Sequence, residues 1–329
     1  MKDKALTRAI VREFGPIQDV VQLEQLPLPP LAAGDARVKM VYATINPSDI
    51  ITISGAYRSR ISVPFVPGFE GVGAIIQAPD GARLPVGQRV LPIGSMGNWQ
   101  TFKDTRPEWC FTLPDFISDR QAVNSYVNPM TALLMLTEAL DFKPGQRILI
   151  NAANSAIGKM LIRIANTLRL TPIAVVRKAE NLALFDDFQV ESVLNSSDQD
   201  YSQALERIKR SGGVDAIFDC IGGEESLTFA EVLIPGGQFI HYGLLSGKPV
   251  PPQFWRTRPD IRFMNFHLRQ WIHSQEKPVV QRKIDEVMAL IRDGIVHTDI
   301  ATAFRLENIA DAIDAALSGE LKGKILIEI

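Results

Sequence analysis

The stretch from Arg147 to Lys178 constrains the fold of this chain more than any other. It holds an apolar segment, a turn of small residues, an amphipathic helical pattern from about Ser155, and a second apolar segment. A strand, tight turn, helix and strand within about 30 residues form the unit that holds a dinucleotide pyrophosphate at a helix N-terminus. We therefore expect a parallel sheet covered by helices, with a nucleotide site at this turn.

The glycine fingerprint of such a turn is incomplete here. Ala152 to Ile157 fill most of the places of the G-x-G-x-x-G pattern, and only Gly158 remains, where helix and strand pack. A plain strand–helix–strand crossover is therefore the alternative for this turn. The expected pyrophosphate donors are Asn154, Ser155, Ala156 and Ile157, although Ser155 could equally serve only as a helix N-cap.

The second strand ends in Arg177 and Lys178, where an acidic residue would be needed to hold a free pair of ribose hydroxyls. A guanidinium makes charge-assisted, often bidentate contacts with phosphate. The pair is therefore predicted to hold the 2′-phosphate of NADPH, with a solvated charged strand end as the alternative.

Composition narrows the classes of function. The 329 residues suffice for two domains, and a net charge of -2 gives no basic field for nucleic acid. No apolar run approaches the ~20 residues of a membrane span. The only cysteines, Cys110 and Cys220, are expected to be reduced thiols. We expect a cytoplasmic enzyme acting on a small molecule.

Short strand patterns separated by prolines fill residues 1–122, with strands expected at Arg37–Tyr42, Gly71–Gln77 and Gln88–Pro92. Strand and helix patterns then alternate over residues 123–265, which predicts an α/β domain with a parallel sheet. The expected strands there are Ile148–Asn151, Ile173–Val176, Ser192–Leu194, Val214–Cys220 and Gly237–Tyr242. The expected helices are Ser155–Leu168, Ala179–Phe188, Tyr201–Lys209 and Glu224–Leu233.

The C-terminal part, residues 266–329, is expected to return to the first domain. Its patterns predict helices at Val280–Ile291 and Ile309–Leu317 and a last strand at Lys324–Ile329. The segment Pro249–Gln275 is expected to be irregular.

Several strings together resemble the medium-chain dehydrogenase/reductase superfamily along the whole chain. They include INPSDIITISGAY (Ile45–Tyr57), PGFEGVG (Pro67–Gly73), VNPMTALLML (Val127–Leu136), NAANSAIG (Asn151–Gly158) and FHLRQW (Phe266–Trp271). The most similar branch is that of zinc-free, mitochondrial-type enoyl-thioester reductases, with quinone reductases next. The resemblance implies a Rossmann-like nucleotide domain, a GroES-like catalytic domain and NADPH as cofactor.

The zinc alcohol dehydrogenases of this superfamily provide a contrast. The places of their catalytic zinc ligands are taken here by Asn46, Phe69 and, in less certain register, Val127. Phe69 has no lone pair to donate, so we expect no metal. Without a Lewis acid, hydride should go to an acceptor that is already electrophilic, such as a carbon–carbon double bond conjugated to a carbonyl.

The resemblance also suggests roles for individual residues. Tyr57 matches the tyrosine that donates a proton or hydrogen bond to the developing enolate, and a loop tyrosine with only a packing role is the alternative. The residues expected near the cofactor are Asn128 and Thr131 (alternatively helix caps), Tyr242, Phe266 and Leu268. Those expected near the substrate are Asn46, Phe69 and Trp99, of which Asn46 could instead orient loops and Trp99 could instead be a core residue.

Three functions follow from these patterns. The first is NADPH-dependent reduction of an activated double bond, with a trans-2-enoyl thioester as the expected substrate. The second is NADPH:quinone reduction, and the third is a protein that binds NADPH without catalysis. A homodimer is expected by analogy, because superfamily members commonly pair the edge strands of their nucleotide domains.

Overall fold

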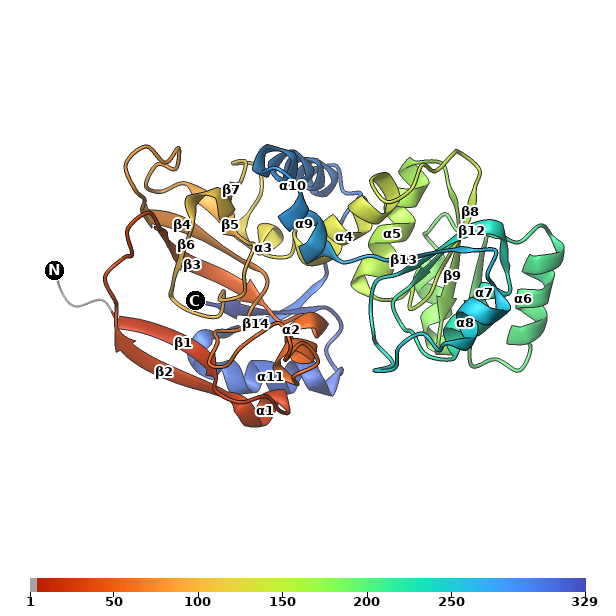
Figure 1. Cartoon of the computed structure of the whole chain (residues 1–329), viewed down its shortest axis with the longest axis horizontal. Coiled ribbons are helices and arrows are strands. Elements are labelled where there is room, and N and C mark those ends of the chain that lie inside the picture. The colour runs from red at the N-terminus through yellow and green to blue at the C-terminus, as the bar shows by residue number, and fades with distance from the viewer. Residues whose placement is uncertain (1–4) are drawn as a thin grey trace. The chain divides into compact units, whose positions relative to one another are not determined.

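A computed structural model describes residues 5–329 of the chain, which divide into two compact units (Figure 1). The first unit runs up to Val127 and resumes at Arg269–Ile329, and the second is Asn128–Leu268. The boundaries expected from the sequence, after residues 122 and 265, lie five and three residues earlier than these.

The second unit is built on a sheet of six parallel strands in the order β10-β9-β8-β11-β12-β13. Their bounds are β8 Arg147–Ile150, β9 Thr171–Val176, β10 Ser192–Asn195, β11 Val214–Asp219, β12 Leu233–His241 and β13 Arg262–Asn265. The strand order turns back at β8, because β9 and β10 extend the sheet on one side and β11 to β13 on the other. The carboxyl end of β8 is therefore the place where a doubly wound sheet binds ligands.

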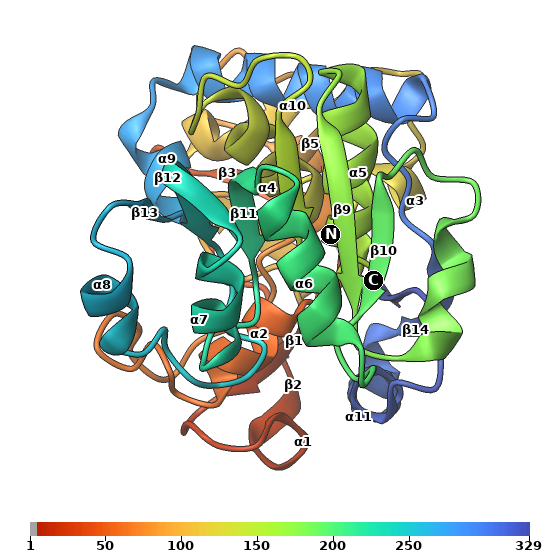
Figure 2. The same cartoon turned by 90° about the vertical axis from the view of Figure 1, so that its right-hand side faces the viewer.

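Helices cover both faces of this sheet (Figure 2). They are α4 (Val127–Thr137), α5 (Ala156–Thr167), α6 (Tyr201–Arg210), α7 (Glu225–Ala230), α8 (Gln253–Thr257) and the 3-10 segment η2 (Ala179–Phe185). Right-handed crossovers put α5 on one face and α6 and α7 on the other. Apolar side chains such as Leu149, Ile217 and Phe239 form the core. The α/β fold with a Rossmann-like sheet is confirmed.

Two local expectations for this unit are wrong. The segment Pro249–Gln275 is not irregular, because it contains α8, β13 and the start of α9 (Leu268–Ser274). These short elements form because aromatic rings pack together, with Phe263 stacked 5.9 Å from Phe239. Only four residues of β13 pair with β12, too few for a clear period. The helix expected at Ala179–Phe188 is the 3-10 segment η2.

The first unit contains a seven-stranded sheet and a separate hairpin of β1 (Ala5–Val11) and β2 (Val21–Pro27). The sheet has the order β14-β15-β3-β4-β5-β7, with β6 also paired to β3. Its strands are β3 Ala36–Thr44, β4 Gly71–Gln77, β5 Arg89–Pro92, β6 Phe102–Thr105, β7 Cys110–Thr112, β14 Ile300–Arg305 and β15 Lys324–Glu328. Sequence patterns identified only β3, β4, β5 and β15 of these strands.

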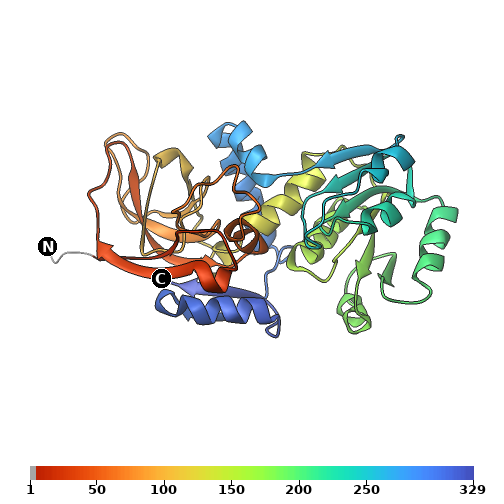
Figure 3. The ribbon, with the colours of Figure 1, turned by 60° about the horizontal axis from the view of Figure 1, so that its bottom comes forward.

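The helices of the first unit are short except for two near the C-terminus. They are α1 (Ile17–Val20), α2 (Pro47–Ile53), α3 (Asp119–Ala122), α9, α10 (Lys277–Arg292) and α11 (Ile309–Ser318), with 3-10 turns η1 (Pro107–Trp109) and η3 (Leu306–Asn308). The blue helix α11 packs against β14 and β15 (Figure 3). No helix found within residues 5–329 is long and apolar enough to cross a membrane.

Candidate cofactor and active site

In the turn between β8 and α5, the backbone of the first helical turn packs closely against the backbone of the preceding residues. Ala152 has a positive φ of 44°, which is uncommon for a residue with a side chain. A Cβ on Gly158 would lie 2.6 Å from the carbonyl oxygen of Ala153, so only glycine fits there. Gly158 therefore permits the close helix–turn packing that a dinucleotide turn requires.

Ser155 is the N-cap of α5, and its hydroxyl accepts a hydrogen bond from the backbone N–H of Gly158 at 3.1 Å. The next two residues, Ala156 and Ile157, lie in the first helical turn, where backbone N–H groups have no acceptor within the helix. The helix N-terminus thus presents donors and a positive dipole end, which suit a pyrophosphate.

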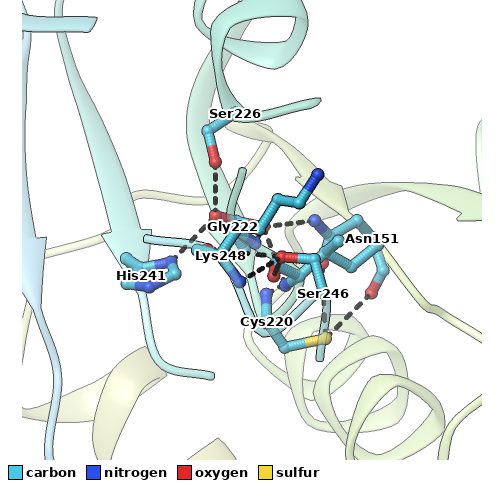
Figure 4. A network of polar contacts seen from close by, with 9 residues as sticks. Asn151, Cys220, Gly222, Ser226, His241, Ser246 and Lys248 are labelled. Atoms are coloured by element: carbon cyan, nitrogen blue, oxygen red, sulfur yellow. Dashed lines mark hydrogen bonds and ion pairs between the residues drawn. The ribbon is translucent and has the colours of Figure 1, made fainter. Parts of the chain in front are cut away.

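Asn151 links the turn to the neighbouring strand β11. Its side-chain nitrogen donates to Asp219 Oδ1 at 2.5 Å, and its side-chain oxygen accepts the N–H of Cys220 at 2.9 Å. Both Asn151 and Asp219 are fully buried. The carboxyl ends of β8 and β11 are therefore joined by a buried polar network (Figure 4).

Asp219 is the centre of this network. Besides Asn151 it accepts hydrogen bonds from the backbone N–H groups of Ile221 and Gly222, the Ser226 hydroxyl and Nδ1 of His241. Burial alone would raise the pKa of Asp219, but the bonds from His241, Gly222 and Asn151 outweigh it and lower this pKa below its usual value. Asp219 is thus held as a carboxylate.

The predicted phosphate-binding pair lies at the end of β9. Arg177 and Lys178 are both exposed, and Lys178 pairs with Glu180 at 3.6 Å. Burial raises the pKa of Glu225 at the start of α7, and the positive charge of Arg177 opposes this rise. The two side chains are therefore close enough to interact electrostatically. An exposed guanidinium beside the nucleotide turn is free to meet a phosphate.

The first unit has its own buried polar cluster, made of Asn46, Asp49, Glu70 and Lys324. The side chain of Asn46 donates to Glu70 at 2.7 Å and accepts from the ammonium of Lys324. The backbone N–H of Asn46 donates to Asp49 at 2.8 Å. Every polar group of the Asn46 side chain is thus bonded within the protein.

Two of these groups are buried acids. Burial raises the pKa of Asp49 to about 7, against the effect of the backbone N–H groups of Asn46 and Phe69 that donate to it. Burial raises the pKa of Glu70 as well, opposed by the charge of Lys324 and by the N–H groups of Val127 and Tyr126. Glu70 therefore anchors the chain at the first residue of α4.

Tyr57 lies in the turns that follow α2 and is half-buried. Its carbonyl accepts the N–H groups of Arg60 and Ile61, which fixes the backbone at this point. Its hydroxyl makes no hydrogen bond to any residue in the described range 5–329. The phenol is therefore free to donate to a ligand.

Comparisons with known proteins agree with this architecture. Residues 32–127 match a family model described as the alcohol dehydrogenase GroES-like domain, and residues 189–327 match one described as zinc-binding dehydrogenase. A mitochondrial enoyl-[acyl-carrier-protein] reductase of Caenorhabditis elegans is 31% identical over 95% of this chain and 93% of its own length. The chain belongs to the medium-chain dehydrogenase/reductase superfamily.

Solved structures extend the comparison. A putative NADPH:quinone reductase from Bacillus thuringiensis superimposes with a TM-score of 0.94 at 30% identity, covering 99% of both chains. An Escherichia coli quinone oxidoreductase complexed with NADPH has a TM-score of 0.89 at 21% identity, covering 98% of this chain and 100% of the other. The second likeness shows the shared fold.

The zinc-binding description of one family model can be compared with the residues at the places of the superfamily's catalytic zinc ligands. At the places that the resemblance assigns to the catalytic ligands, Asn46 is already bonded on both side-chain atoms and Phe69 has no lone pair to donate, while Val127 matches the third place in less certain register. Within residues 5–329, no group of three or more His, Cys, Asp and Glu side chains is arranged to hold a metal.

The structure corrects the expectation for Trp99 at the substrate. This side chain is 0% exposed, and its indole N–H donates to the carbonyl of Thr44 at 3.1 Å. Gly68 packs on the ring so closely that a Cβ would lie 2.4 Å from it. Trp99 is therefore a core residue, which was the alternative considered for it from the sequence.

Asn46 is likewise committed to the buried cluster and orients the start of α2, so its side chain is not available to substrate. Phe69 is half-buried, and its N–H donates to Asp49 at 3.0 Å. Of the three residues expected at the substrate, only Phe69 is not fully buried.

The remaining predicted residues all lie in the second unit. Asn128 and Thr131 lie in the first part of α4, as its second and fifth residues. The backbone N–H of Phe266 donates to the carbonyl of His241 at 2.8 Å, and Leu268 begins α9. The Tyr242 hydroxyl is buried and lies beside the thiol of Cys220.

Sequence reasoning missed four residues that organise these clusters: Asp219, His241, Glu70 and Lys324. Asp219 and His241 each end an apolar strand, and this was the available signal. Glu70 and Lys324 gave none, because their partners are far away in the chain.

Proposed function

We propose that this protein is an NADPH-dependent reductase of carbonyl-conjugated double bonds, with a trans-2-enoyl thioester as its substrate. The observation that carries the proposal is the β8–α5 turn, where Gly158 allows the close approach and Arg177 follows on the next strand. The enoyl reductase relative, 31% identical along nearly the whole chain, supports the substrate class.

NADPH fits the residues present. The first turn of α5, with Ala156 and Ile157, offers backbone donors for the pyrophosphate, and Asn154 and Ser155 precede them. Arg177 and Lys178 would hold the 2′-phosphate, and Asn128, Thr131, Tyr242, Phe266 and Leu268 would line the rest of the cofactor. The bound cofactor would supply the hydride.

The chemistry needs no metal. Hydride adds to the β-carbon of the enoyl group, negative charge collects on the thioester oxygen, and a proton is added at the α-carbon. The free phenol of Tyr57 stabilises that enolate by donating a hydrogen bond or the proton itself. Phe69 makes the substrate side apolar, which suits an acyl chain.

The test follows NADPH oxidation with crotonyl thioester, with a simple quinone and with buffer alone, and repeats it with NADH. We expect turnover of the crotonyl thioester with NADPH and little with NADH. Tyr57→Phe should lower kcat by about 100-fold, because general-acid assistance is lost. The half-buried Tyr42 on β3 gives a matched control, Tyr42→Phe, which should keep full activity. Full turnover by Tyr57→Phe would remove the assignment.

Quinone reduction is the second candidate, favoured by the 30% identical NADPH:quinone reductase structure. Reduction of a quinone does not require protonation of a carbon atom after hydride transfer. Tyr57→Phe should therefore leave quinone turnover unchanged. NADPH binding without oxidation by either acceptor would instead identify a binding protein that lacks catalysis.

Two further proposals concern the setting of the enzyme. A homodimer through β13 is supported by its position at the edge of the sheet and by Trp255 beside it, 48% exposed and 5.3 Å from Phe263. Sedimentation should then give twice the 36.4 kDa of the chain. A cytoplasmic location is supported by the free thiols of Cys110 and Cys220.

A further inference from the structure

The pair of His241 and Asp219 has no part in the function proposed so far. His241 ends β12 and lies directly opposite Asp219, which ends β11. Its Nδ1 is 2.8 Å from Asp219 Oδ2 (Figure 4). The ring also stacks 6.3 Å from Phe263 on β13. Both contacts fix the imidazole, while 12% of its side chain stays exposed.

The pair determines what the second ring nitrogen can bind. Asp219 Oδ2 accepts the hydrogen bond at Nδ1, so this contact selects the imidazole tautomer that carries its proton on Nδ1. Nε2 then has a lone pair and accepts a hydrogen bond, and no described residue of 5–329 supplies one. The natural partner is a hydroxyl of a ligand.

The strand order shows which part of a dinucleotide lies near this nitrogen. The pyrophosphate turn follows β8, Arg177 follows β9 on one side, and His241 ends β12 on the other side. A dinucleotide lying across the carboxyl ends of the strands, with its 2′-phosphate at Arg177, extends its other half toward β11 and β12. Two strand spacings separate β8 from β12, about 10 Å.

We propose that Nε2 of His241 accepts a hydrogen bond from a hydroxyl of the nicotinamide ribose, and that Asp219 is the positioning residue that fixes the imidazole. Gly222 belongs to the same arrangement, because a Cβ there would lie 3.2 Å from the His241 ring and crowd it. The proposal rests on the NADPH assignment above and deepens it by naming the ribose as the ligand group.

The test compares the affinities of two ligands for His241→Asn. The asparagine amide takes the place of Nδ1 and still donates to Asp219, whereas it has no atom in the place of Nε2. We expect NADPH to bind about five- to tenfold more weakly to this variant, the effect of one lost hydrogen bond. The affinity for 2′,5′-ADP, which lacks the second ribose, should not change.

Two other variants complete the experiment. His241→Gln places an amide near the position of Nε2 and should recover part of the lost NADPH affinity. His297 pairs with Asp299 at 3.0 Å on the exposed surface of the first unit, so His297→Asn is the matched control and should bind both ligands as the wild type does.

Each outcome decides the matter. Unchanged NADPH affinity in His241→Asn, or equal weakening of NADPH and 2′,5′-ADP, overturns the proposal, because the second result means that His241 only supports the fold of the site. Failure of the wild-type protein to bind either ligand contradicts the NADPH assignment itself, which is a distinct result.

Discussion

At the scale of single residues, the half-buried Lys324 is the counter-charge of two fully buried acids. Asp49 and Glu70 are each 1% exposed, and the charge of Lys324 favours the ionised form of both. Removing one partner of such a cluster leaves uncompensated buried charge. Lys324 thus holds together the start of α2 and the first residue of α4.

Lys324→Met should lower the free energy of unfolding by about 3 kcal/mol, measured by urea denaturation at pH 7. The exposed Lys322, two residues away, gives the control: Lys322→Met should change stability by less than about 0.5 kcal/mol. Equal stability of the two variants would show that the buried acids do not need this cation.

Asp49 should make stability depend on pH. Its pKa is raised from 3.8 to about 7, so the folded protein binds this proton more tightly than the unfolded chain does. The contribution of this bound proton to the stability of the folded protein is therefore complete below pH 4. It is lost as the pH rises through 7, and the free energy of unfolding falls by up to about 1.4 kcal/mol per pH unit. Glu70, whose pKa is also raised, acts with the same sign.

Urea denaturation of the wild type and Asp49→Asn at pH 5.0 and about 7.5 measures this dependence. The difference in stability between the two proteins should shift in favour of the variant at the higher pH. A difference that is the same at both values would mean that Asp49 has an ordinary pKa in the folded protein.

At the scale of elements, the β8–α5 unit depends on Gly158. Gly158→Ala brings a methyl group within 2.6 Å of a backbone oxygen, so the turn must open. We expect NADPH affinity to fall by more than about tenfold, since the donors of the first helical turn move away from the pyrophosphate. Ser202→Ala, at an exposed place in the first turn of α6, is the control. Unchanged NADPH affinity in Gly158→Ala would place the pyrophosphate elsewhere.

Elements with a long apolar period were predictable from sequence. The helix α5 and the strand β11 lie within two residues of their expected bounds, because each buries one regular face or a continuous run. The strand β13 was not predictable, because its four residues acquire their conformation from pairing with β12 and from packing against aromatic rings.

The candidate site was predictable only in part, for the same reason. Local patterns identified the turn at Gly158 and the exposed Arg177. The Asp219–His241 contact depends on the register between two neighbouring strands, and the cluster of Asn46, Glu70 and Lys324 joins residues up to 278 positions apart. Trp99 shows a different error: its match to a family motif suggested a place at the substrate, but its side chain is fully buried in the core.

At the scale of the whole molecule, the chain has the fold of a superfamily whose members carry out more than one reduction. The matched relatives include an enoyl reductase and an NADPH:quinone reductase, each about as similar as the other. Overall similarity therefore does not distinguish the two activities. The position to which hydride is transferred distinguishes them, because only enoyl reduction forms a carbon–hydrogen bond at the β-carbon.

The most direct test incubates the protein with crotonyl thioester and NADPH carrying deuterium at the transferred position, and determines the product by mass spectrometry and NMR. We predict butyryl thioester with one deuterium at the β-carbon, and with the α-proton taken from solvent. Consumption of the labelled cofactor without a β-deuterated product, or reduction of a quinone alone, would contradict the proposed function.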